Sequence, residues 1–198
     1  MFLKCTLCAV LGYCIGSAVA AIIISRVFFH DDVRERGSGN SGATNAARTY
    51  GLAFGILTFA FDFAKGLLAC RLGKLIAGDA GLALAGFASV IGHCFPAFFK
   101  LRGGKGVSCG SAFALMLNSR IFLCALALFV TVFAVTRIVS LASVTGAAAV
   151  GVLSLVILDA PILRIMGLLA ALVVIFMHRS NIKRLFKGEE KQFTFGKR

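Results

Sequence analysis

Long apolar runs follow one another through almost the whole chain, separated only by short charged or glycine-rich segments. A bilayer core of about 30 Å needs about 20 helical residues, and most of the runs approach or reach that length. Backbone groups in lipid must be bonded internally, which favours helices, and the alternation that a membrane β-barrel needs is missing. The sequence therefore predicts an all-α integral membrane protein with a bundle of about seven transmembrane helices. The seven runs are Cys5–Ser25, Tyr50–Cys70, Leu75–Phe99, Gly104–Asn118, Ile121–Thr136, Ile138–Leu158 and Ile162–Met177.

Composition excludes a water-soluble domain. Of the 198 residues, 59% are hydrophobic and 15% are charged, whereas soluble domains have about 25% charged residues. The mean hydropathy is +0.94, and a chain of this size could not bury so much apolar surface in water. The net charge of +13 does not indicate a nucleic-acid partner, because the basic residues stand mostly at the ends of apolar runs.

The distribution of Lys and Arg predicts the orientation in the membrane. With the N-terminus outside and seven spans, fifteen of these residues fall on the cytoplasmic side and five outside, as the positive-inside rule requires. The C-terminus is then cytoplasmic. One alternative is that Lys4 and Ala18-Val19-Ala20 belong to a cleaved signal peptide, although six further runs favour an uncleaved first span. The short run Gly104–Asn118 is expected to be a half-span or to lie in a thinned bilayer.

Two sets of residues inside the apolar runs are interpreted as structural. The seven cysteines are odd in number and lack paired metal-ligand spacing, so they are expected to be small packing residues. Asp62 and Lys65 are three residues apart within the second run, and buried charges in a membrane are usually paired or functional. An internal ion pair is favoured over catalysis.

Three polar segments fall on the predicted cytoplasmic face, which suggests a single site. In Gly37–Arg48, successive glycines would let backbone N–H groups converge on an anion, and a helix beginning near Ala43 would point its positive end there; a solvated loop is the alternative. In the second segment, Lys100–Gly106, Lys105 stands among glycines with open access to a phosphate, or else belongs to an ordinary basic cap. In the third, His178 and Asn181 share one helical face, although His178–Glu190 alone would also suit an interfacial amphipathic helix.

Several enzyme signatures are absent from the sequence. There is no Gly-x-Ser-x-Gly elbow, no His-Glu-x-x-His motif, no His-x-x-x-x-Asp pair and no Asp-rich metal signature. An enzyme built on this chain would lack an obvious nucleophile and metal, and no metal or cofactor is expected.

The motifs in these segments resemble those of the bacterial acyl-phosphate–glycerol-3-phosphate acyltransferases (PlsY type). The matching positions are Gly37 to Asn45 with Arg48, Gly92-His93 to Pro96, Arg102 to Val107, and His178 to Asn181 with Arg184-Leu185 and Gly188-x-Glu190. Their order and spacing agree over nearly the whole chain, as do Asp62-x-x-Lys65-Gly66 and the region of Ser140-Leu141. The resemblance implies a single transmembrane acyltransferase domain over residues 1–198 in the bacterial cytoplasmic membrane, with its active site facing the cytoplasm.

The resemblance implies that acyl phosphate and sn-glycerol 3-phosphate give 1-acyl-glycerol 3-phosphate and inorganic phosphate, a step of phospholipid biosynthesis. Acyl phosphate is a mixed anhydride and already activated, so the protein mainly has to bring two anions together. Membrane lipid and the enzyme that makes acyl phosphate are the further partners it implies. The competing hypotheses are a small-anion channel or transporter and a structural membrane subunit.

Residue roles are also implied by the matching positions. Arg48 and Lys105 would bind the phosphate groups, His178 and Asn181 would orient the attacking hydroxyl, and Ser38 would help to cradle phosphate. The expected catalytic residues are Ser38, Arg48, Lys105, His178 and Asn181. The expected substrate-binding and phosphate-binding residues are Gly39, Asn40, Thr44, Asn45, Gly103, Gly104, Gly106 and Ser140.

Overall fold

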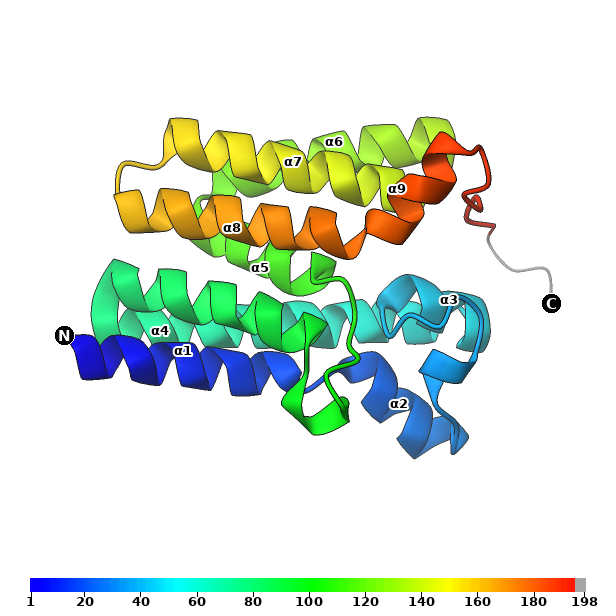
Figure 1. Cartoon of the computed structure of the whole chain (residues 1–198), viewed down its shortest axis with the longest axis horizontal. Coiled ribbons are helices and arrows are strands. Elements are labelled where there is room, and N and C mark those ends of the chain that lie inside the picture. The colour runs from blue at the N-terminus through cyan, green and yellow to red at the C-terminus, as the bar shows by residue number, and fades with distance from the viewer. Residues whose placement is uncertain (195–198) are drawn as a thin grey trace.

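The chain is all-helical in the computed structural model, which describes residues 1–194. Helices lie roughly side by side in one bundle, with the N-terminus at one end and the segment after α9 at the other (Figure 1). In chain order the elements are α1 (Phe2–Ser17), α2 (Ala20–Phe29), the 3₁₀ helix η1 (Val33–Glu35), α3 (Ala43–Tyr50), α4 (Leu52–Cys94), the 3₁₀ helix η2 (Ala97–Phe99), α5 (Val107–Leu117), α6 (Ser119–Thr136), α7 (Val139–Ile157), α8 (Pro161–Met177) and α9 (Arg179–Phe186).

The longest helix, α4, is a hairpin of two arms. Ala77 and Gly78 have non-helical backbone angles, and Gly78 has φ +60°, a conformation that glycine adopts without strain. After this turn the chain comes straight back, so that a Cβ on Gly73 would lie 2.2 Å from the Gly81 carbonyl oxygen. The turn lies beyond Lys74, whereas the sequence analysis placed the boundary at Arg71–Lys74; the two basic residues are instead in the last turns of the first arm.

The seven predicted runs each correspond to a helix, a helix pair or an arm of α4. By length and composition, four stretches could cross a membrane, and a fifth is added if α8 and α9, bent by 57°, are taken together. One of the four contains the α4 hairpin and supplies two antiparallel arms. Helix α5 has only 11 residues, in agreement with the short span expected there. The four stretches are Phe2–Phe29, Leu52–Phe99, Ser119–Thr136 and Val139–Ile157.

The first span is broken between α1 and α2, and the expected ion pair lies at the break. Lys65 Nζ is 2.6 Å from Asp62 Oδ1 and donates a hydrogen bond to the Ala18 carbonyl oxygen at 2.8 Å. Asp62 Oδ1 also accepts from the Ala20 N–H at 3.3 Å. A helix break leaves backbone groups without intrahelical partners, which is costly in lipid. The ion pair therefore completes the hydrogen bonding of the first span, and the sequence prediction of an internal pair is confirmed.

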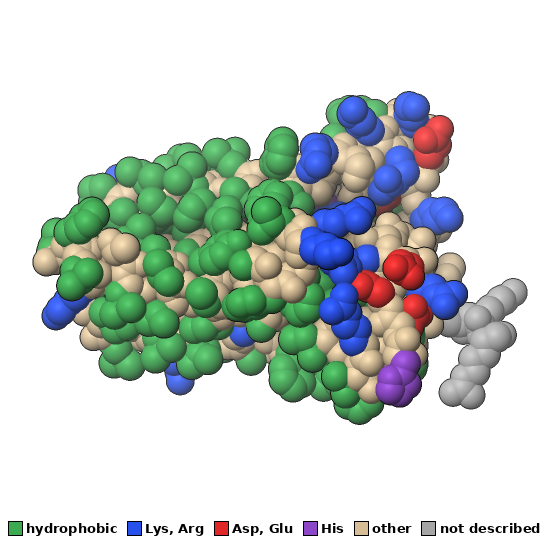
Figure 2. All heavy atoms as spheres, turned by 60° about the horizontal axis from the view of Figure 1, so that its bottom comes forward, with side chains coloured by type: hydrophobic (Ala, Val, Ile, Leu, Met, Phe, Trp, Pro, Cys, Tyr) green, Lys and Arg blue, Asp and Glu red, His purple; other side chains and the backbone are tan. Residues whose placement is uncertain are grey.

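Charged side chains gather at one end of the molecule. Figure 2 shows an extended hydrophobic surface over the helical body and a band of Lys and Arg, with Asp and Glu among them, at the other end. The polar end contains η1, α3, α9 and the segment after α9 (Figure 1). Lys197 and Arg198, which entered the charge count, lie outside the described residues. All seven cysteines are free, and Cys8, Cys70, Cys94 and Cys109 are buried, in line with a packing role.

Candidate active site

The three polar segments meet in one cleft of about 920 Å³ at the polar end of the bundle. This agrees with the expectation of a single site. Of the expected site residues, Ser38, Gly39, Asn40, Thr44, Asn45, Arg48, Lys105, Ser140, His178 and Asn181 line the cleft, whereas Gly103, Gly104 and Gly106 do not. Further lining residues include Arg179, Arg184, Glu189, Glu190 and Lys191.

Four helices begin at this cleft. The first residues of α3, α5, α7 and α9 are all among its lining residues. A helix N-terminus carries partial positive charge and unpaired N–H groups, so the four together make the cleft attractive to anions. Helix α3 begins at Ala43, as the sequence analysis expected; the contributions of α5, α7 and α9 were not foreseen.

Asn45 shapes the first segment rather than facing a ligand. Its side-chain oxygen accepts the Ser38 N–H at 2.8 Å, and its amide nitrogen donates to the carbonyls of Val33 at 3.0 Å and Arg36 at 3.1 Å. The side chain is almost wholly buried, and these bonds use both ends of the amide. Asn45 therefore holds the loop that presents Ser38. Both its amide oxygen and its amide nitrogen are already hydrogen-bonded within this loop, so neither is free for the expected contact with phosphate.

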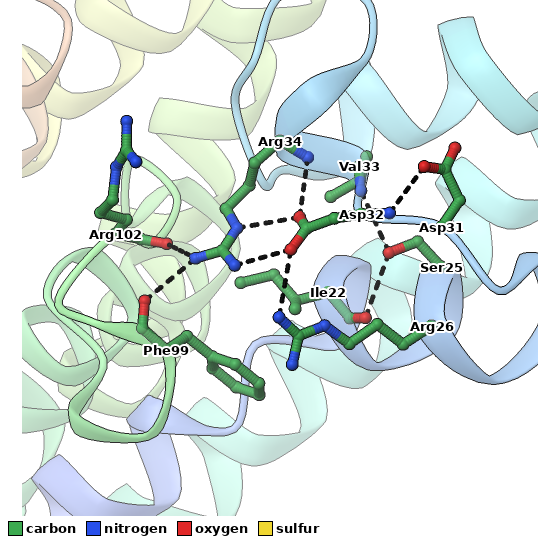
Figure 3. A network of polar contacts seen from close by, with 9 residues as sticks. All are labelled: Ile22, Ser25, Arg26, Asp31, Asp32, Val33, Arg34, Phe99 and Arg102. Atoms are coloured by element: carbon green, nitrogen blue, oxygen red, sulfur yellow. Dashed lines mark hydrogen bonds and ion pairs between the residues drawn. The ribbon is translucent and has the colours of Figure 1, made fainter.

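Ion pairs and hydrogen bonds fasten η1, directly before the first segment, to the loop that begins the second (Figure 3). Arg34 binds Asp32 through two nitrogens, at 2.9 Å and 2.7 Å. Its third nitrogen donates to the carbonyl of Phe99 at 3.0 Å and to that of Arg102 at 3.3 Å. The Arg34 guanidinium holds the pKa of the Asp32 carboxyl well below its ordinary value. Arg34 thus acts as a brace between two loops.

The glycines of the second segment permit close packing against the end of α4. The Gly103 N–H donates to the Cys94 carbonyl at 3.1 Å, and the Gly104 N–H donates to the His93 carbonyl at 3.0 Å. A Cβ on Gly104 would lie 2.2 Å from His93 Nε2. The expectation that the Gly103 and Gly104 amides cradle phosphate is therefore wrong in this structure, because both are already bonded to the helix end. Gly106 has φ +80° and is the N-cap of α5.

A chain of polar contacts runs from Lys105 to Glu190. Lys105 Nζ donates to the Asn181 side-chain oxygen, and the Asn181 amide nitrogen donates to Glu190 Oε1 at 2.6 Å. Glu190 also accepts from Ser140 Oγ and from Arg184 Nε, each at 2.7 Å. Burial would raise the pKa of Glu190, but the hydrogen bonds from Ser140, Asn181 and Arg184 prevail and lower it. Both ends of the Asn181 amide are engaged, so Asn181 positions Lys105.

Glu190 is the residue that the sequence analysis did not place in the site. The signal was present, because Glu190 belongs to the Gly188-x-Glu190 motif and is one of few acids in a strongly basic segment. Its three hydrogen-bond partners could not all be inferred from spacing, since Ser140 is 50 residues away.

Lys105 and His178 have unusual surroundings for ionisable groups. Burial lowers the pKa of Lys105 to about 8, with Arg184 and Arg48 acting in the same direction and Glu190 opposing them. His178 is buried, and its Nδ1 lies 2.8 Å from the Val174 carbonyl oxygen. A carbonyl only accepts hydrogen bonds, so we assign the proton to Nδ1, which leaves Nε2 as the basic nitrogen.

An apolar slot of about 160 Å³ adjoins the cleft. The two share Phe59, Val107, Phe129 and Ser143. Most other residues of the slot are hydrophobic and come from α5, α6, α7 and α8. A polar cleft that opens into such a slot can hold a molecule with a charged head and an apolar chain. Among residues 1–194, no group of three or more His, Cys, Asp and Glu side chains could hold a metal ion.

Comparison with known proteins agrees with this geometry. The family model described as "Glycerol-3-phosphate acyltransferase" matches residues 6–188. The glycerol-3-phosphate acyltransferase of Thermoanaerobacter sp. (strain X514) is 39% identical over 94% of both chains. The crystal structure of PlsY (YgiH), an integral membrane glycerol 3-phosphate acyltransferase, matches in its glycerol 3-phosphate form with TM-score 0.91 and 31% identity over 96% of both chains. Its lysophosphatidic acid form matches with TM-score 0.86 and 30% identity over the same shares. The chain therefore belongs to the glycerol-3-phosphate acyltransferase family of integral membrane proteins.

Proposed function

We propose that this protein transfers an acyl group from acyl phosphate to the 1-hydroxyl of sn-glycerol 3-phosphate, giving 1-acyl-glycerol 3-phosphate and inorganic phosphate. The observation that supports this most directly is that a polar, positively charged cleft opens into an apolar slot. A cleft with four helix N-termini, Arg48 and Lys105 joins an apolar slot. The cleft suits two phosphorylated reactants, and the slot suits the acyl chain that one of them carries.

Acyl phosphate as the donor explains why the site needs no side-chain nucleophile. The glycerol hydroxyl oxygen attacks the acyl carbon directly, a new C–O ester bond forms, and the bond between the acyl carbon and the phosphate oxygen breaks. Phosphate leaves with the bonding electron pair, and the hydroxyl proton passes to a phosphate oxygen of a substrate. The protein contributes proximity and the shielding of negative charge.

The residues around the cleft divide this work. Arg48 and Lys105 bind the two phosphate groups, helped by Ser38 and by the first turns of α3 and α5, because two phosphates in a low dielectric repel strongly. Gly39, Asn40 and Thr44 line the same wall of the cleft. His178, with Nε2 unprotonated, accepts a hydrogen bond from the attacking hydroxyl and orients it. Glu190 and Asn181 fix the position of the Lys105 ammonium.

In this proposal the protein lies in the bacterial inner membrane, and its polar end faces the cytoplasm. The excess of Lys and Arg at that end supports this orientation. Glycerol 3-phosphate then enters from water and the acyl chain from the bilayer. The enzyme that makes acyl phosphate is the natural neighbour on the same face, because it would deliver an amphipathic donor.

A comparison of acyl donors tests the proposal. Purified protein in detergent is given glycerol 3-phosphate with acyl phosphate, acyl-coenzyme A or acyl-carrier protein, and lysophosphatidic acid and phosphate are measured. We expect equal amounts of both products with acyl phosphate and no product with either thioester. Product from a thioester but not from acyl phosphate would contradict the proposed donor. Flux of glycerol 3-phosphate or phosphate through proteoliposomes without turnover would instead support the transporter hypothesis.

A further inference from the structure

The segment after α9 crosses the polar end of the molecule and lines the cleft. We refer to residues Glu189–Thr194 as the C-terminal strap; all but Phe193 are among the lining residues of the cleft. Figure 1 shows this segment, in red, running along the polar end beyond α9. The strap lies beyond residues 6–188, the part that matches the family model. Glu190, at its start, belongs to the Gly188-x-Glu190 motif, whereas Phe193 lies beyond both that motif and the matched residues.

The strap is attached at two places. At its start, Glu190 accepts hydrogen bonds from Ser140, Asn181 and Arg184. At Phe193, the backbone N–H donates to the Arg137 carbonyl at 2.7 Å, directly after α6, and the ring contacts the Phe133 ring edge-on with centroids 6.3 Å apart. Phe193 is thus held against the end of α6 by its backbone and by its ring.

Arg48 meets that ring. The Arg48 guanidinium carbon lies 5.8 Å from the Phe193 ring centroid, within the range of a cation–π interaction. Arg48 is in the last turn of α3 and is exposed. Among residues 1–194, no carboxylate forms an ion pair with it, in contrast to Arg34 and Arg184. An arginine without such a partner has substantial rotamer freedom to lose when it binds a ligand.

We propose that Phe193 is a positioning residue that orients Arg48 for the phosphate of glycerol 3-phosphate. The proposal rests on the proposed function, in which Arg48 binds phosphate. An aromatic ring contacts the face of the planar guanidinium, whereas phosphate is bound along its N–H edge. The two contacts are compatible at the same time. By holding Arg48 beforehand, Phe193 lowers the entropy lost on binding and so raises the affinity for the acceptor.

A series of substitutions at Phe193 separates this role from simple packing. Phe193→Ala and Phe193→Leu remove the aromatic face, and Phe193→Trp keeps it. An exposed cation–π contact is worth roughly 0.5–1 kcal/mol, which corresponds to about a two- to fivefold change in affinity. We therefore expect the KM for glycerol 3-phosphate to rise about two- to fivefold in the Ala and Leu variants, with kcat nearly unchanged, and to return to the wild-type value in the Trp variant.

Two controls identify the partner. Phe186→Ala removes an aromatic side chain from α9 that is 89% exposed, and we expect no change in KM. In the background of Arg48→Ala, Phe193→Leu is expected to have no further effect on the KM, because the residue on which it acts is gone. Thermal unfolding midpoints of all variants show whether the fold is intact.

Unchanged kinetics in Phe193→Ala would overturn the proposal, as would a Trp variant that is no better than the Leu variant, or additive effects in the double variant. Failure of the proposed function itself looks different. In that case the wild-type protein shows no turnover with acyl phosphate and glycerol 3-phosphate, whereas failure of this inference alone leaves wild-type turnover and a KM that depends on Arg48 but not on Phe193.

Discussion

The molecule contains two clusters of charged and polar side chains, one inside the helical body and one in the cleft. They are built from similar residues but have different roles. In the body, Asp62 and Lys65 are paired with each other and with the free backbone groups of a broken helix, and both contact His93. In the cleft, Lys105 donates to a neutral amide, and the nearby carboxylate of Glu190 is shared among three other donors. Lys65 thus has a carboxylate as a direct partner, whereas among residues 1–194 no carboxylate forms an ion pair with Lys105. The comparison teaches that pairing, rather than the presence of a charge in an apolar protein, distinguishes a structural group from a binding group.

The largest effect is expected from unbalancing the first cluster. Asp62→Asn leaves the Lys65 ammonium buried without a counter-charge, which costs roughly 3–5 kcal/mol when a buried pair is broken. We expect a large fall in the thermal unfolding midpoint in detergent. Asp62→Asn combined with Lys65→Met removes both charges and should recover much of this loss. A single variant as stable as the wild type would show that the pair does not hold the first span.

Removing the central cation of the second cluster should affect activity and leave the fold intact. Lys105→Ala takes away the ammonium proposed to stabilise phosphate, and the loss of one such group typically lowers the rate about 10²–10³-fold. We expect kcat/KM for acyl transfer to fall at least about a hundredfold, with the unfolding midpoint little changed. Lys105→Arg, which keeps the charge, is the matched control and should retain more activity. Near-normal turnover in Lys105→Ala would refute the proposed role.

The smallest effect concerns pH. Because burial lowers the pKa of Lys105 to about 8, the ammonium is present below that pH and is lost as the pH rises through it. The second ionisation of a phosphate monoester, with a pKa of about 6, is complete by then. We expect kcat/KM for glycerol 3-phosphate to be near its maximum at pH 7, to reach about half of it at pH 8, and to fall at higher pH by up to about tenfold per unit.

Lys105→Arg is the control for this pH dependence. Arginine stays protonated across the range, so the profile of that variant should remain level above pH 8. A wild-type profile that is also level to pH 9.5 would show that Lys105 remains charged and that the contrast between the two clusters does not extend to their titration.

Much of the fold was predictable because hydrophobic length is a local property. The seven apolar runs, the short α5 and the beginning of α3 at Ala43 all follow from residues close together in the sequence. The break after Ser17 was not predictable in this way. It contains neither proline nor glycine, and it is stabilised by Asp62 and Lys65, more than 40 residues away. The turn of α4 was misplaced by a few residues because Arg71 and Lys74 remain helical up to Gly78.

The sequence could predict which residues line the site better than it could predict their hydrogen bonds. The three polar segments and most of their candidate residues do line one cleft, because the connections between the apolar helices bring those segments to one end of the bundle. Which atoms are free depends on contacts that no spacing reveals. The amides of Gly103 and Gly104 are bonded to the end of α4, and the side chain of Asn45 is bonded to its own loop. Glu190 was missed because one of its partners, Ser140, is 50 residues away and the other two bind it only once the chain after α9 folds back.

The break in the first span has a consequence for how sequences of this kind can vary. An unwound turn in hydrocarbon, a carboxylate and an ammonium satisfy one another at Ala18, Ala20, Asp62 and Lys65, so the loss of any one leaves the others stranded. Relatives should therefore either keep the acid and the base together at the interrupted helix or lose both of them. A chain that keeps only one of the two charges would be poorly folded, so we expect the two positions to change together among related sequences.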